Sequence, residues 1–72
     1  MSMTSEAKIS KSQAKTLRTL IALGGKVNVS VAIPGINRAG IIGMGKLGLL
    51  SVDIPTCEVI VLKAGYAHSA VQ

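Results

Sequence analysis

Aromatic residues are almost missing from this sequence. Tyr66 is the only one, and the chain has no tryptophan and no phenylalanine. Because 49% of the residues are nevertheless hydrophobic, the chain can bury a core, but that core has to be aliphatic. The same composition argues against disorder over most of the chain. A chain of 72 residues is long enough for one small domain.

Side chains that bind metals or attack substrates are also scarce. Cys57 is the only cysteine, which excludes an intramolecular disulfide and favours a reducing compartment, so we expect a cytoplasmic protein. Cys57 and His68 together supply too few ligands for a protein-only zinc site. No second histidine is present to activate the Cys57 thiol. We therefore expect neither a metal nor a catalytic cysteine.

Glu6, Asp53 and Glu58 are the only acids in the chain. Asp53 and Glu58 flank Pro55, an arrangement expected in a loop, and they form no general acid–base pair. We therefore expect no enzyme activity and no cofactor. Eight lysine and arginine residues leave a formal charge of +5, which favours a polyanionic partner. The alternative is that this charge serves solubility alone.

Long hydrophobic runs are absent as well, because Arg38 and Lys46 interrupt the most apolar stretch, so we expect no membrane span. Residues 1–9 are predicted to form a flexible basic N-terminal arm, and residues 10–72 a single domain. The first helix begins with a capping box in which Ser10 is the N-cap and Gln13 reaches back. Gly24-Gly25 predicts its end.

Two sets of side chains are expected on that first helix. One set is apolar and faces the core: Ala14, Leu17, Leu20 and Ile21. The other is a basic stripe that is either solvated or lies along phosphates: Lys11, Lys15 and Arg18. The following segment, residues 26–33, alternates valines like a strand, yet Ser30 and Pro34 would also suit a brief helix.

A second helix is predicted from its cap at Asn37 to Gly48. Its expected inner side is apolar or small: Ile36, Gly40, Ile41, Met44, Leu47 and Gly48. Its expected outer side carries Arg38, Ile42 and Lys46, with Gly45 turned toward that side. Residues 49–53 and 58–62 then read as strands joined by a hairpin loop at residues 54–57, and a last turn of helix is expected near Gly65 and Tyr66.

The glycines of the second helix also imitate nucleotide-binding loops. Residues 40–46 fit the start of a phosphate-binding loop, but Leu47 stands where serine or threonine would hold magnesium. Gly43, Gly45 and Gly48 fit a dinucleotide-binding turn after a strand at residues 39–43. A βα fragment of that kind therefore remains an alternative, although Lys63 stands near the position expected to carry an acid.

The order of these elements resembles a winged helix-turn-helix domain over about residues 10–67. The residues that carry the resemblance are Leu17, Leu20 and Ile21, Met44 with Gly48-Leu49-Leu50, and the strands at residues 51–53 and 58–62. The resemblance implies an α+β fold, with helices followed by a two-strand β-hairpin wing. It also implies a transcription regulator, expected to be a homodimer, that binds double-stranded DNA with residues 37–47 in the major groove.

By position, the resemblance places Asn37, Arg38, Ile42 and Lys46 toward the groove. Arg38 would read a guanine edge and Ile42 a thymine methyl group. The hairpin loop has no basic residue, so Thr56 or backbone amides would contact phosphate there. A different class of function is a protein-interaction or oligomerisation module, for which Ile42 and Leu49 would form an exposed apolar patch.

Overall fold

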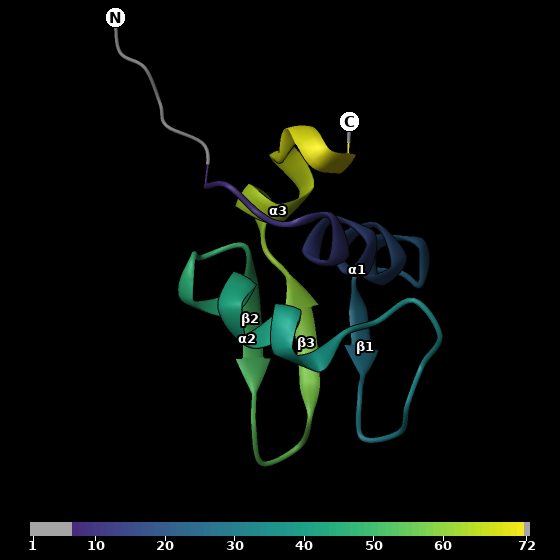
Figure 1. Cartoon of the computed structure of the whole chain (residues 1–72). Coiled ribbons are helices and arrows are strands. Elements are labelled where there is room, and N and C mark those ends of the chain that lie inside the picture. Colours follow the sequence, from purple (N-terminus) through teal and green to yellow (C-terminus); the bar gives the residue numbers. More distant parts are fainter. Residues whose placement is uncertain (1–6, 72) are drawn as a thin grey trace, which may run out of the picture.

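Residues 7–71 are described by the computed structural model (Figure 1), so the expectation for an arm at residues 1–6 lies outside the described part. In chain order the elements are α1 (Lys11–Ala22), β1 (Lys26–Asn28), α2 (Arg38–Lys46), β2 (Leu50–Asp53), β3 (Glu58–Val61), α3 (Lys63–Ala67) and the 3₁₀ turn η1 (Ser69–Val71). They form an α+β domain with a three-stranded antiparallel sheet in the order β1-β3-β2. Within residues 7–71, no helix has the length and hydropathy needed to cross a bilayer.

Helix α1 begins and ends where the sequence predicts. Ser10 Oγ accepts a 3.1 Å hydrogen bond from the Gln13 amide, and Gln13 Oε1 accepts one of 2.9 Å from the Ser10 amide. This reciprocal pair satisfies amides that have no partner inside the helix. At the other end, Gly24 and Gly25 adopt positive φ, and their amides bond back to carbonyls of the last turn at 3.0 and 2.9 Å. These bonds form the left-handed termination that a glycine allows.

The segment at residues 26–33, for which a strand and a short helix were both open, forms only the brief strand β1. The strand closes just after Asn28: the Val29 amide still donates to the Cys57 carbonyl at 2.8 Å, and Asn28 Oδ1 then accepts a 2.9 Å hydrogen bond from the Ser30 amide in a local turn. Ser30 caps no helix, and the chain continues as a loop to a turn where Gly35 has φ +88°.

Helix α2 is capped by Asn37, as predicted, and Gly48 ends it with φ +80°. Its buried residues are Gly40, Ile41 and Met44. The prediction was wrong for Leu47 and Gly48, which are exposed. The helix ends at Lys46 and the chain turns there, so these two positions no longer follow the helical face.

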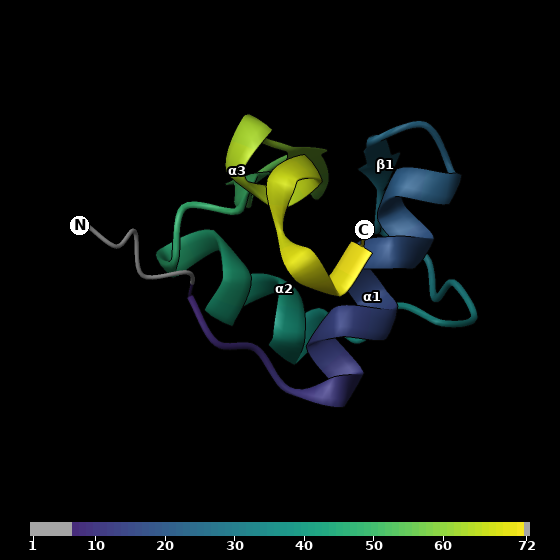
Figure 2. The ribbon, with the colours of Figure 1, turned by 90° about the horizontal axis from the view of Figure 1, so that it is seen from above.

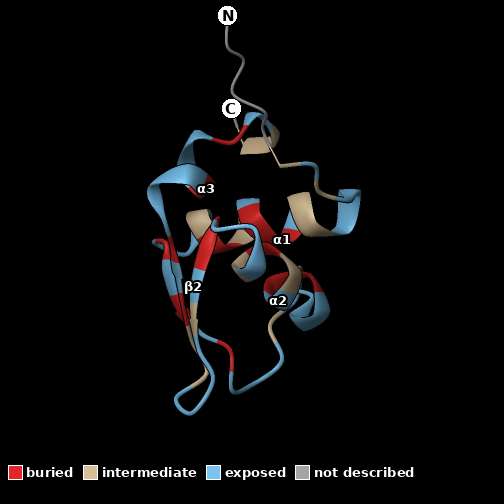
Figure 3. Ribbon diagram, turned by 90° about the vertical axis from the view of Figure 1, so that its left-hand side faces the viewer, coloured by how far each residue is buried: buried red, intermediate tan, exposed pale blue. Residues whose placement is uncertain are grey.

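Helices α1 and α2 cover one side of the sheet (Figures 1, 2 and 3). The predicted hairpin forms from β2 and β3, and β1 adds a third strand to it, with Lys26 opposite Ile60. Three valines lie side by side across the sheet, and their side chains point toward the helices: Val27, Val59 and Val52. Alternate residues point to the other side, where Ser51 and Ile60 are exposed.

The core is aliphatic, as the composition predicts. Its fully buried side chains come from both helices and the central strand: Leu17, Leu20, Ile41, Met44 and Val59. Leu49 belongs to this core at 4% exposure, so its predicted place in an exposed patch was wrong. The reason is the turn at Gly48, after which the Leu49 amide bonds to the Met44 carbonyl at 3.1 Å and the side chain points inward.

Helix α3 packs between the turn that precedes β2 and the turn that follows α1. Gly65 of α3 is buried so closely that a Cβ there would lie 2.5 Å from the Leu49 carbonyl oxygen. The hydroxyl group of the Tyr66 side chain lies against Gly25, where an added Cβ would overlap it. Because glycine has no side chain at either position, α3 can approach the chain on both sides.

His68 joins the two ends of the described chain. Its Nε2 lies 2.6 Å from the Ala7 carbonyl oxygen, and its Nδ1 accepts a 3.0 Å hydrogen bond from the Ala70 amide. Ile9 packs against the core. Residues 7–9, which were predicted to belong to a loose arm, are therefore attached to the domain.

Candidate nucleic-acid interface

The eight residues predicted to contact DNA lie on three elements. Lys11, Lys15 and Arg18 belong to α1, Arg38, Ile42 and Lys46 with their cap Asn37 belong to α2, and Thr56 belongs to the hairpin loop. All eight are exposed. Helices α1 and α2 pack against each other, so the first two groups occupy one helical layer (Figure 2). Thr56 lies apart, in the loop between β2 and β3.

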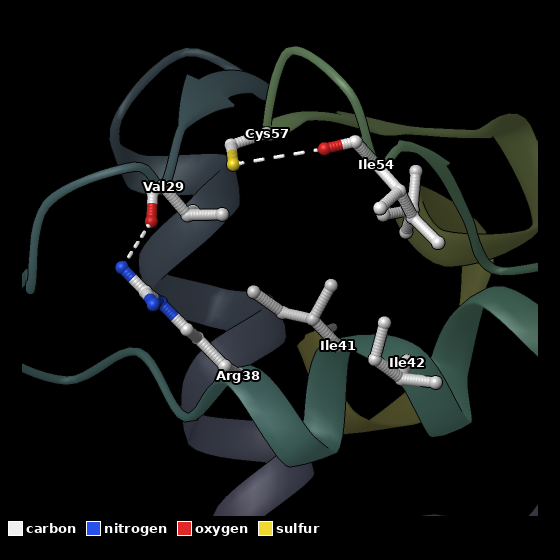
Figure 4. A pocket seen from close by; sticks show the side chains of 7 residues that line it. Val29, Arg38, Ile41, Ile42, Ile54 and Cys57 are labelled. Atoms are coloured by element: carbon white, nitrogen blue, oxygen red, sulfur yellow. Dashed lines mark hydrogen bonds between the residues drawn. The ribbon is translucent and has the colours of Figure 1, made fainter.

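The outer side of α2 carries Arg38, Ile42 and Lys46, as the helical spacing predicts. Arg38 does not simply project into solvent. Its Nη2 donates a 2.7 Å hydrogen bond to the Val29 carbonyl oxygen, which directs the guanidinium along the loop that follows β1 (Figure 4). To pair with a guanine edge through both arms of the guanidinium, Arg38 would have to leave this carbonyl.

Both polar atoms of the Asn37 side chain form hydrogen bonds within the domain. Its Oδ1 accepts from the Ala39 amide at 3.0 Å, and its Nδ2 donates to Ser12 Oγ at 3.0 Å. Its own amide donates to the buried Thr16 Oγ1 at 3.0 Å. Asn37 therefore starts α2 and ties that start to α1, and contact with a base would compete with these bonds.

The three basic residues on α1 differ in whether their charged groups are available to a ligand. Lys11 and Lys15 are exposed, and no ion pair to them is found within residues 7–71. Arg18 donates from Nη1 to the Ala70 carbonyl at 3.1 Å, so its guanidinium is directed to the C-terminal segment. Only the two lysines of this stripe are therefore ready for a phosphate.

Charge differs between the two layers of the domain. Helices α1 and α2 contribute three and two basic side chains and contain no acid. The acids of the described chain, Asp53 and Glu58, lie opposite each other on β2 and β3. Glu58 is 3.9 Å from Lys26 Nζ, so one sheet charge is partly balanced within the sheet. Among residues 7–71, the helical layer is therefore the basic side of the domain.

The glycine-rich stretch forms no nucleotide-binding turn. Residues 38–46 are one continuous helix, so the strand at residues 39–43 and the turn that the dinucleotide alternative requires are absent there. Gly43 and Gly45 have no positive φ, while Gly48 uses its positive φ to end the helix. That alternative was wrong.

Sequence reasoning missed a pocket of about 260 Å³ between α2 and the hairpin (Figure 4). It is lined by Val29, Arg38, Ile41, Ile42, Val52, Ile54 and Cys57. Cys57 closes the hairpin loop with φ +60°, a conformation uncommon for a residue with a side chain, and its Sγ lies 3.7 Å from the Ile54 carbonyl oxygen. No sequence signal marks this pocket, because its walls come from three separate segments.

The residues described here gather no group of three or more histidine, cysteine, aspartate or glutamate side chains that could hold a metal ion. Comparisons with models of protein families, with curated proteins and with solved structures found no match to this chain.

Proposed function

We propose that this protein is a winged-helix DNA-binding protein, a cytoplasmic transcription regulator that acts as a homodimer. Support for the fold comes from the order of its elements, in which α2 is followed directly by the β2–β3 hairpin. Support for the mode of binding comes from the exposed outer side of α2. A helix with its side chains is roughly 10–12 Å across, which suits a major groove about 12 Å wide.

The observation that carries the proposal is the basic helical layer. Lys11, Lys15 and Lys46 project from helices that contain no acid, while Asp53 and Glu58 lie on the sheet. Within residues 7–71, phosphates that approach the helical layer therefore meet cations from helices that carry no carboxylate. Neutralised phosphates release condensed counterions, and this release provides most of the affinity for DNA of any sequence.

Binding to a duplex at several salt concentrations tests the proposal. About four phosphate contacts predict a slope of roughly −3 to −5 in a plot of log K against log salt. Lys15→Gln should reduce the magnitude of this slope by about 1. Lys26→Gln removes the same charge from the sheet and is the matched control, so it should leave the slope unchanged. Binding that does not respond to salt would refute the electrostatic interface.

The second candidate function, an oligomerisation module, is favoured by one observation. Ile42 is 44% exposed and Ile54 is 72% exposed, and both line the pocket between α2 and the hairpin. Apolar side chains of a second copy would cover them. Both functions predict a dimer, so DNA binding separates them: an interaction module should form a dimer that Ile54→Ser weakens in sedimentation, and it should bind no duplex in a salt-dependent way.

A further inference from the structure

We propose that the pocket between α2 and the hairpin binds a small monocarboxylate with a compact apolar body, such as an aromatic acid. The proposal does not depend on DNA binding. Three features support it: the size of the pocket, the apolar character of its walls, and the single guanidinium on its rim.

The size of the pocket suits a ligand of one ring. Its volume of about 260 Å³ exceeds that of an engineered 150 Å³ protein cavity that binds benzene. It approaches the lower end of about 300 Å³ for small-molecule sites. Space therefore exists for a ring and a carboxylate.

The walls are apolar and come from elements that are fixed by the fold. Ile41 is buried in the core, and Val52 lies in the row of valines across the sheet. Ile42 and Ile54 face each other across the mouth from α2 and the hairpin loop (Figure 4). A ligand that covers these two exposed isoleucines removes apolar surface from water, which favours binding.

The charge of the pocket selects the sign of the ligand. Arg38 is the only charged residue in the lining, and its Nη2 is fixed by the Val29 carbonyl. No carboxylate pairs with this guanidinium within residues 7–71. A guanidinium held in this way has further N–H groups in a planar fork, the geometry that carboxylates accept. An amide or an amine of the same shape would lack this charge-assisted pairing.

Titration of the wild-type protein tests the ligand class directly. Benzoate, benzamide and inorganic phosphate are added at constant ionic strength while amide chemical shifts are followed. We expect benzoate to shift residues 29, 38, 42, 52, 54 and 57, with an affinity at least about ten-fold above that of benzamide. Phosphate should not produce these shifts, because it cannot use the apolar walls. Equal binding of benzamide, or no shifts up to about 10 mM benzoate, would overturn the proposal.

Two variants test the role of the guanidinium. Arg38→Gln should weaken benzoate binding at least about ten-fold and leave benzamide binding unchanged. Arg18→Gln is the matched control, because Arg18 also donates to a distant carbonyl but lies outside the pocket. It should leave benzoate binding unchanged. Equal loss in both variants would show a general charge effect and would refute the site.

Cys57 provides a readout that needs no variant, because it is the only cysteine in the chain and lines the pocket. Alkylation by neutral iodoacetamide should slow at least about five-fold when benzoate saturates the protein, since the occupied pocket blocks the thiol. Benzamide at the same concentration should protect less. An unchanged rate at saturating benzoate would place the ligand elsewhere. Protection that requires duplex DNA or a second copy of the chain would show that these, and not the carboxylate, occupy the pocket.

Discussion

Gly45 of α2 faces Val52 of β2, and a Cβ on the glycine would lie 3.2 Å from Val52 Cγ2. The other two interior glycines face a different partner, since Cβ atoms on Gly40 and Gly43 would meet the side chain of Gln13 on α1. Because these glycines have no side chains, α2 packs closely against both α1 and the sheet. These glycines weaken the isolated helix by about 1 kcal/mol each and are offset by packing.

Substitution by alanine should separate these contacts. Gly43→Ala should raise stability by less than about 1 kcal/mol, because the gain in helix propensity is partly offset by displacing Gln13 Nε2, which would lie 2.8 Å from the new methyl group while Gln13 Oε1 holds the Ser10 amide. Gly45→Ala should be close to neutral, because its gain in helix propensity is offset by the tight contact with Val52. Urea unfolding with unchanged m-values measures both. A loss above about 1 kcal/mol for Gly43→Ala would contradict this packing.

Gly65→Ala should instead lower the free energy of unfolding. A Cβ at this position lies 2.5 Å from the Leu49 carbonyl oxygen and 2.9 Å from Val61 Cγ1, and a backbone atom cannot rotate aside. We expect a loss of about 2 kcal/mol or more in the same unfolding experiment. Gly24→Ala meets no atom within 4 Å and isolates the effect of positive φ from that of crowding.

Asn37 should contribute to stability through two separable bonds. Asn37→Ala removes the cap on Ala39 and the bond to Ser12, and should cost about 1–2 kcal/mol. Ser12→Ala keeps the oxygen of Asn37 that caps the helix and loses only the bond to Asn37 Nδ2, so it should retain most of the stability. Thermal unfolding of both variants measures the difference. Equal losses would mean that the bond to α1, and not the cap, is the main contribution.

Arg38 should affect DNA sequence preference if it reads a base. Arg38→Ala should reduce discrimination between duplexes by about 1–3 kcal/mol, because a bidentate base contact is lost. Arg38→Lys keeps the charge without the planar fork and should relax discrimination almost as far. Competition between labelled duplexes measures this effect. Lys15→Ala should weaken all duplexes alike, and a matching change of preference there would argue against base reading by Arg38.

His68 should hold residues 7–9 and the C-terminal turn together. His68→Ala removes both the contact to the Ala7 carbonyl and the acceptor for the Ala70 amide. Amide hydrogen exchange at residues 7–9 and 69–71 should speed up, while exchange in α2 stays slow. Exchange that rises equally throughout the domain would instead show a global loss of stability.

Local signals in the sequence predicted the helix ends correctly. Ser10 with Gln13, Asn37, and the glycines at positions 24 and 48 act through bonds within a few residues, so their effect can be read from a short stretch. The hairpin was predicted for the same reason. Its loop separates two apolar strands by four residues.

Long-range relationships were not predictable in this way. The pairing of β1 with β3 joins residues about thirty positions apart, and the pocket needs three separate segments to meet. A helical wheel also assumes one buried face, whereas α2 contacts α1 through Gly40 and the sheet through Gly45. The direction of Gly45 was therefore predicted wrongly. Groove contact by Asn37, Arg38, Ile42 and Lys46 stays a prediction.

Because Tyr66 lies over Gly25, the intrinsic fluorescence of this protein reports on one region of the fold only. With no tryptophan and no phenylalanine, all intrinsic fluorescence of the chain comes from this one ring. Its emission will follow the separation of α3 from the end of α1. It will not sense events between α2 and the hairpin, where every lining residue is spectroscopically silent in this range. Tyrosine emission therefore reports on the contact between α3 and the end of α1, and a ligand in the pocket between α2 and the hairpin could bind without changing it.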